Sequence, residues 1–141
     1  MHLSGVTFCA QQLHHGPRIL VVDDNAALRG ILRTLLEEQD HWEVCDEASN
    51  GSEAVAKFDE TKFDVVVLDF QMPVMNGLDA AKRITLRSAA TPILMVTMHS
   101  SPQLVEQAKK VGIRGMCPKP DIHCLVEGVA TILDHRPYFK N

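Results

Sequence analysis

The sequence has 141 residues, of which 45% are apolar and 23% are charged, and its formal net charge is −4. This length fits one globular domain, and the composition is typical of a folded protein rather than a disordered one. An acidic chain without a run of Lys and Arg has no electrostatic basis for direct nucleic-acid binding, and no apolar stretch approaches the roughly 20 residues that span a membrane.

Residues 1–17 show no periodic pattern and contain Gly5, Gly16 and Pro17. We interpret them as a flexible N-terminal extension, so that one domain covers residues 18–141. The extension also lacks the basic start and long apolar middle of a signal peptide, which argues against secretion. His14 and His15 lie in it without the fixed spacing of a zinc motif.

The four cysteines are Cys9, Cys45, Cys117 and Cys124, and they are scattered without a close pair. Two of them lie in apolar runs, where a reduced cysteine usually behaves as a small hydrophobic residue. This pattern favours reduced thiols and a cytoplasmic location.

From residue 18 onward, apolar runs of strand length alternate with stretches of helical period. The predicted strands are 19–22, about 42–45, 65–68, 93–96 and 112–117. Each is followed by a helical pattern, around residues 28–36, 54–58, 78–84, 104–108 and 122–133. The first, third and fourth strands are continuously apolar, which requires cover on both faces. We therefore predict an α/β doubly wound fold with five helices and a five-stranded parallel sheet, in the flavodoxin-like order 2-1-3-4-5.

Polar residues stand where the predicted strands stop. In chain order they are Asp23 and Asp24, Asp69, Thr97, and Lys119 with Pro120. The carboxyl ends of parallel strands share one edge of a sheet, so three carboxylates are expected about 5 Å apart if the first and third strands are neighbours. Such a cluster repels itself by roughly 3 kcal/mol per pair. A divalent cation with a preference for hard oxygen ligands, Mg²⁺ (or Mn²⁺), would relieve this repulsion.

An Asp carboxylate can act as a nucleophile and form an aspartyl phosphate when the charge of the incoming phosphoryl group is neutralised. The predicted edge offers Asp69 as that nucleophile, with a metal ion and Lys119 as the positive charges. The hydroxyl of Thr97 would donate a hydrogen bond to the bound phosphoryl group and draw its loop inward, which would act as a switch.

These residues resemble the receiver domain of bacterial two-component response regulators, the CheY-like family. The resemblance rests on 21–25 (VVDDN), 67–77 (VLDFQMPVMNG), Thr97 and Lys119-Pro120, and it covers residues 18 to about 134. It implies a receiver domain in residues 18–141 that takes part in phosphorelay signal transduction as a phosphoprotein rather than as an enzyme.

The resemblance also implies a role for each site residue. Asp69 would be the phosphoacceptor and also a metal ligand. Asp24 would bind the metal directly, and Asp23 would bind it largely through water. The main-chain carbonyl of Gln71 would be a further ligand, and Lys119 would contact the phosphoryl group. Pro73 and Gly77 would shape the loop after Asp69, and a cis peptide would precede Pro120.

Other positions are variable in the family or depart from its common pattern. Met116 replaces the aromatic residue whose rotamer usually follows the threonine, and Met98 replaces a small residue and would narrow access to Asp69. Gln71 and His99 occupy the two positions that tune the lifetime of the phosphoryl group.

The implied phosphoryl donor is a histidine kinase or a histidine phosphotransfer protein. The implied homodimer or partner face is built by the helix after the fourth strand, the fifth strand and the last helix, with Leu104, Val105 and His123.

Three other functions compete with this interpretation. A degenerate receiver would bind partners without phosphorylation, and Met98 and Met116 leave room for it. A Mg²⁺-dependent phosphatase with an Asp nucleophile needs a second Asp two residues later, where this chain has Gln71. A flavin-binding module needs a phosphate cradle after the first strand, where Asp23 and Asp24 would repel phosphate.

Overall fold

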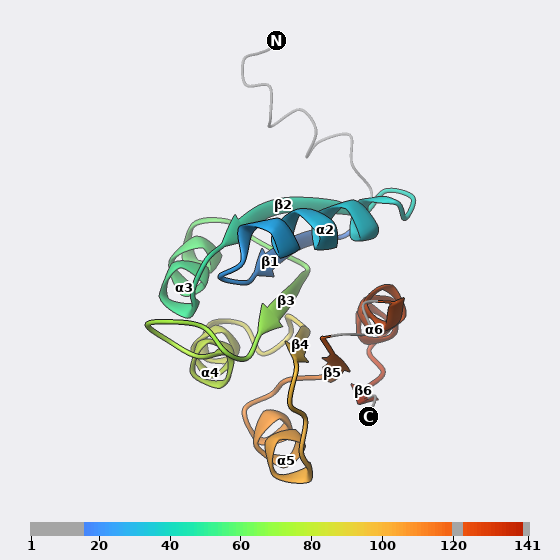
Figure 1. Cartoon of the computed structure of the whole chain (residues 1–141). Coiled ribbons are helices and arrows are strands. Elements are labelled where there is room, and N and C mark those ends of the chain that lie inside the picture. The colour runs from blue at the N-terminus through green and yellow to red at the C-terminus, as the bar shows by residue number, and fades with distance from the viewer. Residues whose placement is uncertain (1–15, 120–122, 140–141) are drawn as a thin grey trace.

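The computed structural model describes residues 16–119 and 123–139, which form one parallel sheet with helices on both of its faces (Figure 1). The sheet has six strands in the order β2-β1-β3-β4-β5-β6. The predicted order of the first five strands and the doubly wound class are confirmed. The N-terminal part of the predicted extension, residues 1–15, lies outside the described residues, as do His14, His15 and Cys9.

The strands are β1 (Arg18–Val22), β2 (Glu43–Ala48), β3 (Val65–Asp69), β4 (Ile93–Thr97), β5 (Gly115–Pro118) and β6 (Tyr138–Phe139). The helices are α2 (Ala26–Glu37), α3 (Gly51–Glu60), α4 (Gly77–Arg87), α5 (Pro102–Lys110) and α6 (His123–Leu133). Within the described ranges, no helix is long and apolar enough to cross a membrane.

Successive residues of the central strands feed two separate cores, because side chains alternate across a strand. On one face, Leu20 of β1 and Val66 of β3 pack with residues of α3, α4 and α5. On the other, Val21 and Val67 pack with residues of α2 and α6. Both faces of β3 and β4 are buried along their whole length, as their unbroken apolar sequences require.

Four helices begin at a side chain that accepts a hydrogen bond from a backbone N–H three residues further on, which satisfies an otherwise unpaired donor. These N-caps are Asn25, Asn50, Asn76 and Ser101. These caps fix where the helices begin, and the loops that follow β1, β3 and β4 meet at one edge of the sheet.

The sequence-based count of five strands was one short, because β6 adds a sixth strand. Tyr138 N–H donates to the carbonyl of Arg114 at 3.0 Å, and β6 runs parallel to β5 with Gly115 opposite Tyr138. Position 115 requires glycine next to β6, since a Cβ there would lie 2.8 Å from the backbone carbonyl oxygen of Tyr138. A two-residue strand has no sequence period, and only its contact with β5 reveals it.

The expectation of reduced thiols was wrong for two of the cysteines. Cys117 at the end of β5 and Cys124 in the first turn of α6 form a disulfide. Their Cα atoms are 6.3 Å apart, inside the usual range for a disulfide. The two residues are seven positions apart, yet α6 packs back against the sheet and brings its first turn beside the end of β5.

Candidate functional site

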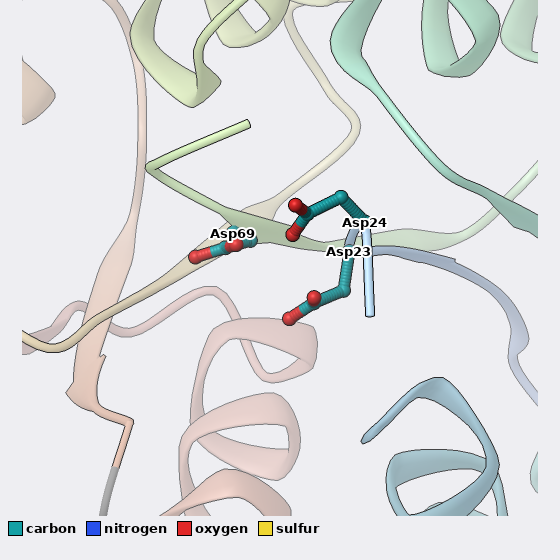
Figure 2. A group of neighbouring side chains, drawn as sticks. All are labelled: Asp23, Asp24 and Asp69. Carbon is teal, nitrogen blue, oxygen red and sulfur yellow. The ribbon is translucent and has the colours of Figure 1, made fainter. Parts of the chain in front are cut away.

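Three carboxyl groups meet at the edge of the sheet where β1 and β3 end (Figure 2). Asp69 is the last residue of β3, and Asp23 and Asp24 follow β1 directly. One oxygen of each carboxylate lies within 4.8 Å of the others. Because β1 and β3 are hydrogen-bonded neighbours, the sequence-based expectation of one acidic cluster at this edge is confirmed.

The three acids differ in exposure and in their local bonds. Asp23 and Asp69 are only 1% and 3% exposed, whereas Asp24 faces solvent. The backbone N–H of Asn25 donates to Asp23 Oδ1 at 2.8 Å, and Asp23 N–H continues the sheet by donating to the carbonyl of Ala48. Asp23 is therefore fixed by both its backbone and its side chain, while Asp24 stands at the mouth of the cluster.

The ammonium group of Lys119 reaches this cluster from the end of β5. Its Nζ lies 3.1 Å from Asp23 Oδ2 and 3.2 Å from Asp69 Oδ2. Its backbone N–H donates to the carbonyl of Thr97 at 2.8 Å, so the end of β4 positions the lysine. The sequence indicated Lys119 as a neighbour of Asp69; its bridge to Asp23 was not foreseen.

The site carries more negative than positive charge, since three carboxylates face one ammonium group. Burial raises the pKa of Asp69 above its ordinary value, the charge of Asp23 raises it further, and Lys119 only partly offsets these effects. For Lys119, burial acts to lower the pKa, but hydrogen bonding to Asp23 and the charge of Asp69 outweigh it, so the pKa is raised. Asp69 is thus a destabilised carboxylate, and Lys119 a firmly protonated amine.

The donor set fits a hard divalent cation. Carboxylate oxygens at the ends of β1 and β3 lie within 4.8 Å of one another. Mg²⁺ is usually held by one or two carboxylates together with water and phosphate oxygens. The residues that would hold it are Asp23, Asp24 and Asp69. Gln71 and Pro73 line an open pocket with Asp24, so the Gln71 segment lies beside the exposed acid of the cluster.

The loop after Asp69 is tightly folded. Gly77 N–H donates to the carbonyl of Phe70 at 2.8 Å, and a Cβ on Gly77 would lie 2.5 Å from the Asp69 carbonyl oxygen, so only glycine fits. Met75 N–H donates to the Pro73 carbonyl across Val74, whose φ of 71° is rare for a β-branched residue. This loop brings the start of α4 against the phosphoacceptor candidate.

The remaining predicted residues lie at different depths. Thr97 is buried at the end of β4, and its Oγ1 accepts a hydrogen bond from His99 N–H at 3.2 Å. His99 itself is exposed, and so is Met98, at 60%. Met116 is buried in the core between the sheet and α3, α4 and α5, so it lies below the edge where the acids meet. Pro120, and with it the predicted cis peptide, lies outside the described residues.

Comparison with known proteins agrees with this architecture. Residues 19–130 match the family model of the response regulator receiver domain. The chemotaxis protein CheY of Thermotoga maritima is 38% identical over 105 residues, which cover 74% of this chain and 87% of that protein. CheY of Halobacterium salinarum is 37% identical over a match that covers 73% of this chain and 84% of that protein.

Solved structures give the same result. A LuxR-family two-component response regulator from Aurantimonas sp. SI85-9A1 superposes with a TM-score of 0.84 at 32% identity, over 88% of this chain and 89% of that one. A CheX–CheY–BeF3–Mg²⁺ complex from Borrelia burgdorferi gives a TM-score of 0.78 at 25% identity, over 86% of this chain and 92% of that one.

The chain belongs to the response regulator receiver domain family. Within that family it is a CheY-like receiver of two-component systems.

Proposed function

We propose that this domain accepts a phosphoryl group from a phosphohistidine donor onto Asp69, and that the modification switches its conformation to control an output or partner. The observation that carries the proposal is the position of Asp69. It is a buried carboxylate at a strand end, with two further acids within 4.8 Å. The ammonium group of Lys119 lies 3.2 Å from its Oδ2.

In the proposed reaction, a carboxylate oxygen of Asp69 attacks the phosphorus of the donor. An O–P bond forms, the N–P bond of the phosphohistidine breaks, and the imidazole nitrogen keeps the bonding electron pair and takes up a proton. A bound Mg²⁺ would neutralise charge on the phosphoryl oxygens. Asp23, Asp24 and Asp69 would hold that ion with the Gln71 carbonyl, and the second carboxylate oxygen of Asp69 would react.

Lys119 would change partners during this transfer. Its Nζ bridges Asp23 and Asp69 through single oxygens, and an ammonium group can turn its three donors toward a phosphoryl oxygen. The hydroxyl of Thr97, which now accepts from His99 N–H, would donate to another phosphoryl oxygen. Movement of the backbone at 97–99 would then carry the signal toward α5. Gln71 and His99 would set how long the modification lasts, and Met98 would narrow access to it.

The partners follow from the same chemistry. The donor would be a histidine kinase or a histidine phosphotransfer protein, which places the domain in the cytoplasm. We propose the α5–β5–α6 face for a homodimer or output partner, with β6 as an additional part of that face. The domain would thereby act in signalling and catalyse only its own phosphorylation and dephosphorylation.

The test is incubation with acetyl phosphate and Mg²⁺, followed by intact mass measurement. The wild-type protein should gain one phosphoryl mass, and Asp69→Asn should gain none. Chelation of Mg²⁺ should abolish labelling. Equal labelling of both proteins would defeat the assignment of Asp69, and labelling that survives chelation would exclude the metal role.

Failure of labelling by acetyl phosphate and by a panel of histidine kinases would favour a degenerate receiver that binds its partners without phosphorylation. The exposed Met98 is the feature that favours this second function, since it stands beside Thr97 and would narrow access to Asp69. Met98→Ala separates the two, because restored labelling would identify a blocked site and continued failure a degenerate one.

A further inference from the structure

The disulfide between Cys117 and Cys124 links two elements on either side of the segment that carries Lys119. Cys117 lies in β5, two residues before the lysine, and Cys124 is the second residue of α6. Both are at least 96% buried, at 1% and 4% exposure, within the core that α2 and α6 form on the sheet. The bridge therefore closes a small loop whose first residues lead into the site.

Lys119 is the residue through which this loop meets the acidic cluster. Its side chain contacts Asp23 and Asp69, and its backbone N–H is bonded to Thr97. A cross-link across a loop removes conformations from the segment that it encloses. With the bridge formed, the start and end of the segment are both fixed, so the position of Lys119 is restricted from both sides.

We propose that Cys117 and Cys124 form a reversible thiol–disulfide site, whose oxidation holds Lys119 against Asp69 and so raises the rate at which Asp69 is phosphorylated. The inference rests on the proposed phosphoacceptor function. Disulfides of cytoplasmic proteins are usually transient or redox-sensing rather than structural. A pair beside the one ammonium group that contacts the acids of the described site is placed to sense redox state.

The oxidation is a thiol–disulfide exchange with a low-molecular-weight disulfide as the oxidant. Both sulfurs are buried in the folded protein, so the exchange takes place when the first turn of α6 opens and exposes them. The thiolate of one cysteine attacks a sulfur of the oxidant, forms a mixed disulfide and releases one small thiolate. The second cysteine thiolate then attacks the protein sulfur of that mixed disulfide, and the Sγ–Sγ bond forms as the second small thiolate leaves. Two protein thiols lose two electrons and two protons, and the oxidant becomes two thiols.

The experiment compares the wild-type protein after equilibration with oxidised or with reduced glutathione. Acid quenching, unfolding in denaturant and alkylation, followed by mass measurement of peptides, give the state of each cysteine, because Cys117 and Cys124 are buried in the folded protein. Phosphorylation of Asp69 by acetyl phosphate with Mg²⁺ gives the rate, and NMR gives the exchange rate of the Lys119 amide that bonds to Thr97. The amide of Phe70, which bonds to Val96 at 3.0 Å in the neighbouring strand pair, is the internal control.

We expect the reduced protein to be phosphorylated about tenfold more slowly, since displacement of a positioning group by about 1 Å can cost up to about a hundredfold. The Lys119 amide should exchange faster after reduction, and the Phe70 amide should not change. Cys124→Ala should show the reduced rate under both conditions. Cys45→Ser is the matched control, because Cys45 lies outside the disulfide, on β2, and this variant should respond to glutathione as the wild type does.

Three results would overturn the proposal. One is full alkylation of both cysteines after oxidation, another is a phosphorylation rate that is the same in both states, and the third is an unchanged Lys119 amide. The amide measurement needs no phosphorylation. A protein that is never labelled but whose Lys119 amide responds to reduction would refute the phosphoacceptor function while leaving the control of Lys119 by the disulfide intact.

Discussion

Two regions of the sheet differ in how their side chains interact. At the ends of β1 and β3, buried carboxylates lie within 4.8 Å of one another with a single ammonium group between two of them. At β5, α6 and β6, the elements are fastened by a disulfide, by a hydrogen bond from Tyr138 to Glu127 and by Lys109 over the ring of Phe139. The repulsive half, Asp23, Asp24 and Asp69 with the loop after β3, contains like charges close together. The fastened half, β5, α6 and β6, is held by contacts that stabilise it.

This contrast shows where the domain gives up stability for function. Buried like charges disfavour the folded state, and they persist because the same groups would bind a cation and a phosphoryl group. The fastened region carries Lys119, the residue that must meet those charges. The disulfide-linked region supports the lysine, and the acidic cluster repels itself. Binding of the proposed cation and phosphoryl group would therefore stabilise the folded domain.

The largest effect is expected where the loop backbone approaches β3. In Gly77→Ala, the new Cβ would meet the Asp69 carbonyl oxygen at 2.5 Å and Phe70 Cα at 2.9 Å. Backbone atoms cannot rotate away as a side chain can, so we expect a loss of about 2–3 kcal/mol in the free energy of unfolding. Urea denaturation measures it.

The matched control for Gly77→Ala is Gly30→Ala, in α2, where a Cβ would meet nothing within 4 Å. That variant should gain about 0.5–1 kcal/mol, because alanine favours a helix interior over glycine. A similar small gain in Gly77→Ala would show that the loop after Asp69 is loosely packed.

The next effect concerns the repulsive half directly. In a chelator, Asp69→Asn should be more stable than the wild type by about 1 kcal/mol, since it removes part of a like-charge repulsion of roughly 3 kcal/mol per pair while also losing a contact with Lys119. The pKa of Asp69 is raised by burial and by Asp23. Its contribution to stability is therefore full at low pH and is lost as the pH rises through the raised pKa.

Thermal unfolding from pH 4 to 8 checks this prediction. The advantage of Asp69→Asn over the wild type should be small at the acid end and grow toward neutral pH, and added Mg²⁺ should reduce it by stabilising the wild type more. An advantage that is independent of pH, or that is greater in Mg²⁺ than in chelator, would contradict the electrostatic origin.

The sequence was informative about the repulsive half because its signals are local. Each apolar strand stops at a polar residue, and parallel pairing brings Asp23 and Asp69 to the same edge without any further information. The order of the first five strands follows from the same alternation. The sequence predicts both Asp23 and Asp24 at this edge, and only the structure distinguishes the exposed acid from the buried one.

The fastened half could not be predicted in the same way, because its stabilising contacts form only once the chain has folded and leave no pattern in the sequence. Cys117 and Cys124 carry no spacing motif, and they meet only because α6 folds back on the sheet. Two cysteines on either side of a predicted strand-to-helix turn were the available signal. The strand Tyr138–Phe139 is too short for a period. The ion pair from Lys119 to Asp23 joins the end of β5 to the end of β1, with β3 and β4 between them in the sheet, and no local sequence pattern contains such a contact.

A smaller effect should reveal strain inside the loop of the repulsive half. Val74 has a φ of 71° and is 83% exposed, so its side chain gains little from packing while its backbone is in a region that β-branched residues avoid. Val74→Gly should raise the free energy of unfolding by about 0.5–1 kcal/mol, after the added chain entropy of glycine is subtracted. Gln103→Gly, at an exposed position of α5, should instead lose about 1 kcal/mol, and a loss in both variants would show that Val74 is unstrained.

The smallest effect should come from a single bond of the fastened half. Tyr138 Oη donates to Glu127 Oε1 at 2.9 Å, between β6 and α6 at the surface. Tyr138→Phe keeps the ring that packs beside Gly128 and removes the hydroxyl that donates to Glu127. The loss should be about 0.5 kcal/mol, the low end for a protein hydrogen bond, because water can replace this exposed one. A double-mutant cycle with Glu127→Gln, followed by urea denaturation, isolates the pair. If Tyr138→Phe instead cost as much as Gly77→Ala, β6 would be held mainly by that bond, and the disulfide and the cation–π contact would contribute little to the edge.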